Sequence, residues 1–361
     1  MKTKSIFIGS TGQNVGKTTT CLGLLAGLKK RHQKVGFMKP IGQENVMTED
    51  QVLVDKDVLL FKEVFDLQDP PAMMSPIVFF KGFTKDYLEG KIVKPDLIES
   101  LKVCFEHLLD YNEALIVEGT GHIGVGSIID LNNAQVASIL GLDMILIASG
   151  GIGSCFDQIA LNKALSDQHG VRIKGIILNK VLPEKKEMVV HYMEKGLKRW
   201  DIPILGVMPY DAFLSNPTIS DYASLFNTEL ISAHEHRIRH FKHLRLIATS
   251  NEVYQTLITP SQLIITPASR EDIILTTIER HNHDIKMEGG MILTGLIPPK
   301  DFLIEKLQKA NIPAFYTPTN TFNAMKMITS YTSKLKKEDY RRVHEAIELV
   351  DHHVDFSKIL S

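Results

Sequence analysis

The sequence predicts an α/β fold in two successive domains, each a mostly parallel sheet covered by helices. Short β-branched and apolar runs alternate with helical patterns from the start of the chain, and a glycine-bearing loop separates the first run from the first helical pattern. A second alternation begins after a polar stretch at Ser232–His243. Such alternation is typical of parallel strands joined by helices. The length of 361 residues is sufficient for two domains of ordinary size.

The first domain is predicted over residues 1–230. Its expected strands are the short apolar runs Ser5–Ile8, Val35–Lys39, Leu115–Glu118, Met144–Ala148, Gly175–Asn179 and Ile204–Val207. Its expected helices are the longer segments Lys17–Arg31, Val54–Phe65, Ala134–Leu140, Phe156–Asp167 and Lys185–Leu197.

The stretch Ser232–His243 is polar and basic, has no strong apolar face, and is predicted to be the junction between the domains. It contains His234, His236, His240 and His243. Histidines four residues apart share a helix face, so a metal site is one interpretation. No cysteine or carboxylate lies in a supporting pattern, which favours a solvated linker or capping helix.

The second domain is predicted over residues 244–361. Its expected strands are Leu244–Ala248, Leu263–Ile265, Gly290–Leu293 and Ala314–Tyr316, with helices between them. The segment Lys337–Val350 is predicted to be a charged amphipathic helix with an exposed polar face.

Composition excludes several classes of function. The net charge is −1 and the predicted pI is 6.9, so charge gives no reason to expect nucleic acid or a membrane surface as a partner. The three cysteines are widely spaced, which is typical of a reducing compartment and fits neither a disulfide framework nor a zinc site. No stretch approaches the roughly 20 apolar residues of a membrane helix. We therefore expect a soluble, cytoplasmic protein.

The most informative motif is the loop Ser10–Thr19, which reads STGQNVGKTT between a predicted strand and a predicted helix. Successive backbone N–H groups and the positive end of a helix bind polyphosphate in such loops. Lys17 would reach the β- and γ-phosphates, and the Thr18 hydroxyl would bind Mg²⁺. The usual pattern has glycine where Thr11 stands, with Gly12 displaced by one position. The alternative, a glycine turn that binds nothing, is disfavoured by the strand–loop–helix context.

Polar residues also follow other predicted strands, and ligands of open α/β sheets bind at the carboxyl ends of strands. Lys39 ends the second strand, where it would meet a phosphate or acidic substrate, although it could be a surface lysine. Glu118 ends an apolar run before two glycines and could hold Mg²⁺. Asp55 or Asp57 could add a carboxylate or favour a helix N-terminus, and the sequence leaves both choices open. Asn179 could present its amide to a base edge or occupy a turn.

These segments resemble the dethiobiotin synthetase-like branch of the P-loop proteins. The likeness lies in STGQNVGKTT, in FMKPIGQ, and in LIVEGTG followed by ILIASGGIGSCFDQIAL. Over nearly its full length the chain resembles the N-terminal region of long-form phosphotransacetylases. In those proteins an ATPase-like domain precedes a DRTGG domain, and here LIITPASREDIIL, MILTGLIPP and IPAFYTPTNTFNAMKMI follow that second pattern. The resemblance implies a P-loop NTPase-type sheet with helices on both faces, followed by a smaller α/β DRTGG-like domain.

The resemblance also implies roles for individual residues. Loop residues would wrap the triphosphate, Lys17 and Lys39 would flank the γ-phosphate as catalytic residues, and Asn179 with Pro209 would meet the adenine. Thr18, Asp57 and Glu118 would hold Mg²⁺. The loop set is Thr11, Gly12, Gln13, Asn14, Val15, Gly16, Lys17, Thr18 and Thr19.

Two departures lie in the second domain. Ser269 replaces an aspartate and Leu296 replaces a glycine of the DRTGG pattern, so a ligand site there is in doubt.

We therefore expect an ATP- and Mg²⁺-binding regulatory or sensor protein with slow ATPase activity. The alternative is an ATP-dependent ligase of the dethiobiotin synthetase or cobyrinate amidase type, acting on a small carboxylate or amine. A third interpretation, a phosphotransacetylase, is disfavoured because no residues remain for the acetyltransferase domain, and the glutamine amidotransferase domain of the cobyrinate amidases also has no counterpart. We expect a homo-oligomer, with a second small ligand or protein partner on the DRTGG-like domain.

Overall fold

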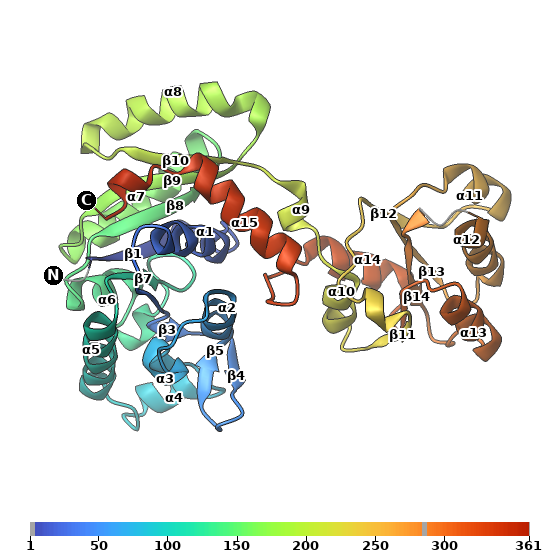
Figure 1. Ribbon diagram of the computed structural model, residues 1–361, viewed down its shortest axis with the longest axis horizontal. Helices are drawn as coiled ribbons and strands as arrows, with labels where there is room; N and C mark the ends of the chain where they lie inside the picture. Colours follow the sequence, from blue (N-terminus) through green and yellow to red (C-terminus); the bar gives the residue numbers. More distant parts are fainter. Residues whose placement is uncertain (1–3, 284–286, 361) are drawn as a thin grey trace. The chain divides into compact units, whose positions relative to one another are not determined.

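The computed structural model describes residues 4–283 and 287–360, which form two compact units (Figure 1). The first unit combines Met1–Asp211 with Leu335–Ser361, and the second unit is Ala212–Lys334. The second unit is therefore inserted in the sequence of the first. Both units are α/β, which confirms the predicted fold class.

The first unit is built on a six-stranded parallel sheet in the order β10-β9-β8-β1-β7-β2. Its strands are β1 (Lys4–Ser10), β2 (Val35–Met38), β7 (Ala114–Glu118), β8 (Met144–Ser149), β9 (Ile173–Val181) and β10 (Ile204–Pro209). Each corresponds to a strand predicted from the sequence. The strand that precedes the phosphate loop, β1, lies between β7 and β8, so the loop emerges at the middle of the carboxyl edge.

Helices pack on this sheet, and small strands extend one side of the unit. The helices are α1 (Lys17–Lys29), α2 (Lys56–Phe65), α3 (Pro71–Met74), α4 (Phe83–Leu88), α5 (Lys94–Tyr111), α6 (Asn133–Ile139), α7 (Gly153–Gln168), α8 (Lys186–Leu197) and α15 (Tyr340–His353). The small strands are β3 (Ile41–Gly42) paired with β6 (Ile77–Val78), and β4 (Asn45–Met47) paired with β5 (Leu53–Asp55). Short 3₁₀ turns lie at Ser127–Ile129, Pro183–Lys185, Lys198–Trp200 and Phe356–Lys358. No helix in the described part of the chain is both long enough and apolar enough to cross a membrane.

The C-terminal helix α15 belongs to the first unit, although the sequence predicted it within the second domain. It packs against α1, the helix that follows the phosphate loop, and against β10. Two glycines allow the close approach, because a Cβ at Gly23 would lie 2.2 Å from Val350 Cβ and one at Gly27 would lie 2.1 Å from the Phe356 ring. After α15 the chain runs along β10, where the N–H of Asp355 donates to Leu205 O at 2.9 Å.

The second unit contains a five-stranded sheet in the order β11-β15-β14-β13-β12. Its strands are β11 (Leu230–Ser232), β12 (His243–Leu246), β13 (Gln262–Pro267), β14 (Gly290–Thr294) and β15 (Ala314–Thr317). The last four are parallel, and β11 runs antiparallel to β15. Its helices are α9 (Ala212–Ser215), α10 (Ile219–Leu225), α11 (Asn251–Leu257), α12 (Glu271–His283), α13 (Asp301–Lys309) and α14 (Thr321–Ser330). Apolar clusters on both sides of the sheet form its core.

The stretch predicted as a junction, Ser232–His243, lies inside the second unit instead. It begins at the end of β11, where Ser232 is buried and donates to Ile312 O at 2.6 Å, and it ends at β12. Its polar composition reflects a surface connection rather than a linker. Within the described residues no group of histidines, cysteines and carboxylates could hold a metal ion, so the four histidines do not form such a site.

Candidate functional site

The phosphate loop joins β1 to α1 and has the backbone shape of an anion-binding turn. Asn14 has a φ of 57° and Gly16 a φ of 90°, so the chain enters α1 through left-handed positions. Gly16 is required for a second reason, because a Cβ there would lie 2.2 Å from Nδ2 of Asn179. No side chain caps the N-terminus of α1 and its first turn contains no acidic residue. The positive end of this helix is therefore available to an anionic ligand.

Lys17, the first residue of α1, points its ammonium group across the mouth of the loop. Its Nζ donates to Ser10 Oγ at 3.2 Å and to the carbonyl of Gly121 at 3.1 Å. Burial lowers the pKa of Lys17, and the nearby Lys39 lowers it further. A polyphosphate would supply the negative charge that favours the ammonium form at this position.

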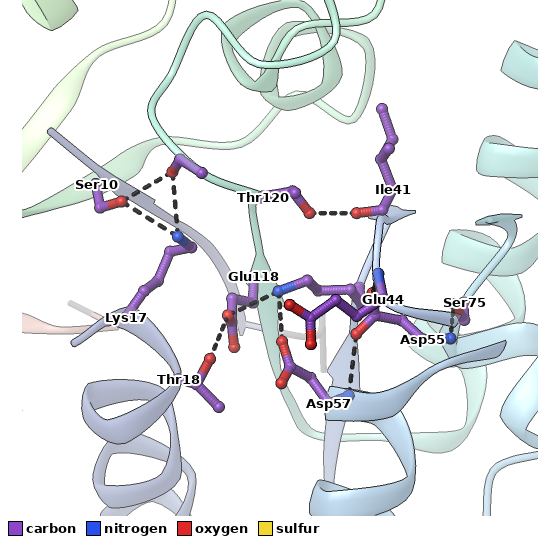
Figure 2. A network of polar contacts seen from close by, with 12 residues as sticks. Ser10, Lys17, Thr18, Ile41, Glu44, Asp55, Asp57, Ser75, Glu118 and Thr120 are labelled. Atoms are coloured by element: carbon purple, nitrogen blue, oxygen red, sulfur yellow. Dashed lines mark hydrogen bonds and ion pairs between the residues drawn. The ribbon is translucent and has the colours of Figure 1, made fainter. Parts of the chain in front are cut away.

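Lys39 follows β2 and lies in a buried network with three residues from other elements (Figure 2). Its Nζ is 2.8 Å from Glu118 Oε1 and 2.7 Å from Asp57 Oδ2. The hydroxyl of Thr18 donates to the same Glu118 oxygen at 3.1 Å. Burial disfavours the Lys39 ammonium, but the carboxylates of Asp57 and Glu118 outweigh burial and hold its pKa well above its usual range. Lys39 is therefore a permanent positive charge in this network.

Glu118 is fully buried, and its second oxygen, Oε2, has no hydrogen-bond partner among the described residues. A buried carboxylate oxygen without a partner is costly unless a cation or water satisfies it. Mg²⁺ is usually held by one or two carboxylates together with phosphate oxygens, and no self-sufficient metal cage occurs within the residues described. Thr18 and Glu118 therefore fit a magnesium ion that a bound phosphate completes.

The structure distinguishes the two aspartates between which the sequence left a choice. Asp55 is the N-cap of α2, where its carboxylate accepts from the N–H of Asp57 at 3.0 Å and of Glu44 at 3.3 Å. Asp57 instead forms an ion pair with Lys39. Of the two, Asp57 is the carboxylate that extends the network of Lys39 and Glu118.

Asp55 leads to a pH-dependent prediction. Burial, and secondarily Asp57, raise the pKa of Asp55 to about 6, against about 3.9 for an exposed aspartate. The folded state therefore holds this proton more tightly than the unfolded state, and this contribution to stability is lost as the pH rises from about 4 to about 6. Asp55→Asn removes the titration and keeps one acceptor oxygen for the N–H of Asp57, while its amide nitrogen replaces the oxygen that accepts from Glu44.

We expect the free energy of unfolding of the wild type, relative to Asp55→Asn, to fall by at most about 3 kcal/mol across that interval. Urea unfolding at successive pH values, followed by the fluorescence of Trp200, measures this difference. Parallel stability curves for the two proteins would contradict the assignment.

Asn179, which the resemblance assigned to the adenine, holds the phosphate loop in this structure. Its Nδ2 donates to Val15 O at 2.8 Å, and its Oδ1 accepts from the N–H of Lys180 at 2.8 Å. The next residue continues the contact, because Lys180 Nζ donates to Asn14 O at 2.7 Å. The structure therefore shows Asn179 in contact with the phosphate loop, and its contact with adenine stays a prediction. Pro209 ends β10 beside Val181 of β9, and its contact with adenine stays a prediction.

Sequence reasoning did not find several residues of this edge. Ser10 and the Gly121 carbonyl hold Lys17, Lys180 holds the loop, and the buried Asn133 and Asn162 contact the segment after Glu118. Lys180 could have been found from its place after Asn179. The two asparagines lie on helices, 13 and 39 residues from backbone groups that they contact, and no local pattern indicates them.

Together, a parallel sheet with a glycine-bearing loop before an uncapped helix, and Lys17, Thr18 and Glu118 at its mouth, define a protein of the P-loop NTPase class. Residues 4–218 match the family described as an AAA domain, and the chain belongs to this family. Residues 221–331 match the DRTGG domain.

Curated relatives match almost the entire chain. Phosphate acetyltransferase from Nitrosomonas europaea is 24% identical over 97% of this chain and 50% of the relative. Phosphate acetyltransferase from Synechocystis is 24% identical over 99% of this chain and 52% of that relative. The chain thus spans about half the length of these relatives, consistent with their N-terminal region. Cobyric acid synthase from Clostridium botulinum is 28% identical over 59% of this chain and 46% of that protein.

Solved structures resemble the chain more distantly. The MinD cell division protein of Aquifex aeolicus covers 58% of this chain and 84% of its own, with 19% identity and a TM-score of 0.37. A plasmid partition protein from Borrelia burgdorferi covers 59% and 90%, with 16% identity and a TM-score of 0.39.

Proposed function

We propose that this protein binds ATP with Mg²⁺ at the phosphate loop and acts as a regulatory or sensor protein that hydrolyses ATP slowly. The observation that carries the proposal is the buried network of Lys39, Glu118 and Thr18, in which Glu118 Oε2 has no hydrogen-bond partner among the described residues. The uncapped N-terminus of α1 and this network would together bind the triphosphate and its metal.

In the bound state the backbone N–H groups of residues 12–18 would hold the phosphate chain. Lys17, whose Nζ is held by Ser10 and Gly121, would donate to phosphate oxygens. Thr18 and Glu118 would hold Mg²⁺, which supplies positive charge to the phosphate oxygens. Lys39, kept charged by Asp57 and Glu118, would stabilise negative charge that develops on the γ-phosphate.

Slow turnover follows from how the carboxylates are used. Glu118 Oε1 already accepts from Lys39 and Thr18, and Asp57 is ion-paired with Lys39. A carboxylate oxygen that already accepts hydrogen bonds from a lysine is a poor base for a water molecule, because its lone pairs are engaged. We therefore expect the site to favour binding over rapid hydrolysis.

The inserted second unit supports the regulatory role. In the sequence it connects the end of β10 directly to the segment that forms α15, and α15 packs on α1. Saturating ATP with Mg²⁺ should change hydrogen exchange around Thr266–Asp272 and Thr294–Pro298 as well as in the phosphate loop, since a sensor must couple its two sites. If exchange in the second unit is indifferent to ATP, the regulatory role is wrong.

An ATP-dependent ligase is the second candidate, and the charged Lys39 beside the γ-phosphate position favours it. The two roles separate in one experiment, in which phosphate release from ATP and Mg²⁺ is measured with and without a diamino acid and bicarbonate. A regulatory ATPase gives the same slow rate in both mixtures. A large stimulation by the acceptors would establish the ligase instead.

The magnesium site has its own test in Glu118→Gln, which nearly preserves the shape of the side chain and removes its charge. We expect the ATP affinity measured with Mg²⁺ to fall about tenfold or more, and the affinity without metal to change less than about threefold. Calorimetric titrations with and without Mg²⁺ measure both values. Glu113→Gln, an exposed glutamate just before the same strand, is the matched control. Equal losses with and without Mg²⁺ would show that Glu118 has another role.

A further inference from the structure

The segment 119–123, which follows Glu118, is anchored by the buried side chains of Thr120 and Ile123 and contains two glycines. Gly119 and Gly121 lack side chains, and Gly121 has a φ of 60°. Glycine-containing segments lose much conformational entropy when they are fixed, so contacts from elsewhere must hold this segment. Its carbonyl at Gly121 accepts hydrogen bonds from Lys17 Nζ at 3.1 Å and from Ser10 Oγ at 2.8 Å. The position of the segment therefore determines where Lys17 is held.

Asn133, the first residue of α6, supplies three such contacts with its side chain. It is 4% exposed, and its Oδ1 accepts from the N–H of Thr120 at 3.0 Å. Its Nδ2 donates to the carbonyls of Thr120 and His122, each at 2.8 Å. A single amide thus satisfies three backbone groups of the segment. Substitution of Gly119 would break this fit, because a Cβ there would lie 2.5 Å from Asn133 Oδ1.

Asn162 of α7 connects the other end of the segment to the phosphate loop. Its Oδ1 accepts from the N–H of Ile123 at 3.1 Å. Its Nδ2 donates to Thr11 O at 3.3 Å and to Gln158 O at 2.8 Å. One buried side chain therefore contacts the beginning of the phosphate loop and the segment that faces Lys17.

We propose that Asn133 and Asn162 are positioning residues that fix the segment 119–123 against Lys17 and so make the site prefer a nucleoside triphosphate over a diphosphate. This inference rests on the proposed ATP binding. The backbone of the phosphate loop and the N-terminus of α1 hold the phosphates that ATP and ADP share. The segment 119–123 meets the end of Lys17, the lysine that reaches the β- and γ-phosphates, so ATP offers this lysine one phosphate more than ADP does. Loss of its order should therefore affect ATP more than ADP.

Asn133→Asp tests the inference with a side chain of the same shape. The introduced carboxylate can still accept from Thr120 N–H, but it places an oxygen against the two carbonyls that Nδ2 now contacts. We expect the Kd for ATP with Mg²⁺ to rise about tenfold or more and the Kd for ADP to change less than about threefold. Lowering the pH should partly restore ATP affinity in this variant but not raise that of the wild type, because a protonated carboxyl can again donate.

Asn132→Asp is the matched control, because it changes the neighbouring residue in the same way. Asn132 caps α6 by accepting from the N–H of Gln135 at 2.9 Å, and an aspartate accepts equally well. Its affinities for ATP and ADP should equal those of the wild type. Asn162→Asp is the second test variant and should also lower the ratio of ATP affinity to ADP affinity. If Asn133→Asp does not fold, Asn162→Asp alone tests the inference.

The outcomes separate this inference from the proposed function. A wild type that binds ATP and ADP equally, or folded variants at both positions that keep the wild-type ratio of ATP to ADP affinity, would overturn the inference and leave ATP binding intact. A wild type that binds neither nucleotide would overturn the proposed function and the inference with it. Loss of ATP preference in both test variants, with an unchanged Asn132→Asp control, supports it.

Discussion

Replacing Lys17 by alanine is expected to raise the Kd for ATP by about a hundredfold or more while the protein stays folded. Each charge-assisted hydrogen bond from a lysine to a phosphate contributes roughly 1.5–3 kcal/mol, and Lys17 would make at least two in the bound state. In the structure its Nζ contacts only Ser10 Oγ and the Gly121 carbonyl among the hydrogen bonds described, so its loss removes little packing. Calorimetric titration with ATP and Mg²⁺ measures the change.

Lys34→Ala is the control for this result, because Lys34 is an exposed lysine just before β2. It should bind ATP as the wild type does. A folded Lys17→Ala variant, judged by circular dichroism, that keeps wild-type ATP affinity would show that the phosphate loop is not the binding site.

Removing residues 335–361 is expected to unfold the first unit, even though the phosphate loop lies at the opposite end of the sequence. The deleted segment contributes α15 and the chain that runs along β10. Its buried apolar side chains are Val343, Ala346, Leu349, Val350, Val354, Phe356 and Ile359. At about 1.5–3 kcal/mol for most of them, their loss amounts to on the order of 10 kcal/mol, which equals the whole stability of a typical domain. Far-UV circular dichroism and urea unfolding of the truncated chain measure the effect.

The control for this truncation is an internal deletion that keeps the C-terminal segment. Residues 212–334 are replaced by a flexible Gly/Ser linker of about 15 residues, which joins Asp211 to Leu335 without imposing a geometry. This variant should fold and bind ATP. A truncated chain that ends at Lys334, folds cooperatively and binds ATP would contradict the assignment of α15 to the first unit.

Much of the fold follows from local sequence patterns. Every strand of the first sheet was predicted, because each is a short run of buried apolar residues bounded by polar or glycine positions. The helix α5 was not predicted, although Pro95 marks its first turn and its apolar positions have helical spacing. The small strands β3 to β6 are only two or three residues long and carry no such pattern.

The division into units could not be predicted from composition. The polar run at 232–243 resembles a linker locally, but pairing of β11 with β15 places its beginning in the second sheet. The return of α15 to α1 depends on a contact between the two ends of the sequence. Its charged residues are exposed or half-buried except Arg342, which is buried, and the partner of its buried face is not encoded in any local pattern. Gly23 and Gly27 become meaningful only when that partner is known.

Some residues of the site could be predicted from the sequence and others could not, and the difference has a physical reason. Lys17, Thr18, Lys39 and Glu118 follow strands or open a helix, and parallel topology brings such positions to one edge. The choice between Asp55 and Asp57 needed the direction of each side chain at the start of α2. Asn133, Asn162 and Asn179 make contacts between separate segments of the chain, and in the case of Asn179 the contact is with the phosphate loop. Spacing along the sequence does not reveal such contacts.

The phosphate loop and Glu118 are proposed to form one site that binds ATP together with Mg²⁺. Isothermal titration of the full chain with ATP, in the presence of Mg²⁺ and again with a chelator, tests it most directly. We expect a single site per chain whose affinity for ATP is higher with Mg²⁺, because Glu118 Oε2 and the Thr18 hydroxyl gain a cation to bind. The absence of any ATP binding would show that this site does not bind ATP. An affinity that is the same with and without Mg²⁺ would show that Glu118 and Thr18 do not hold the metal.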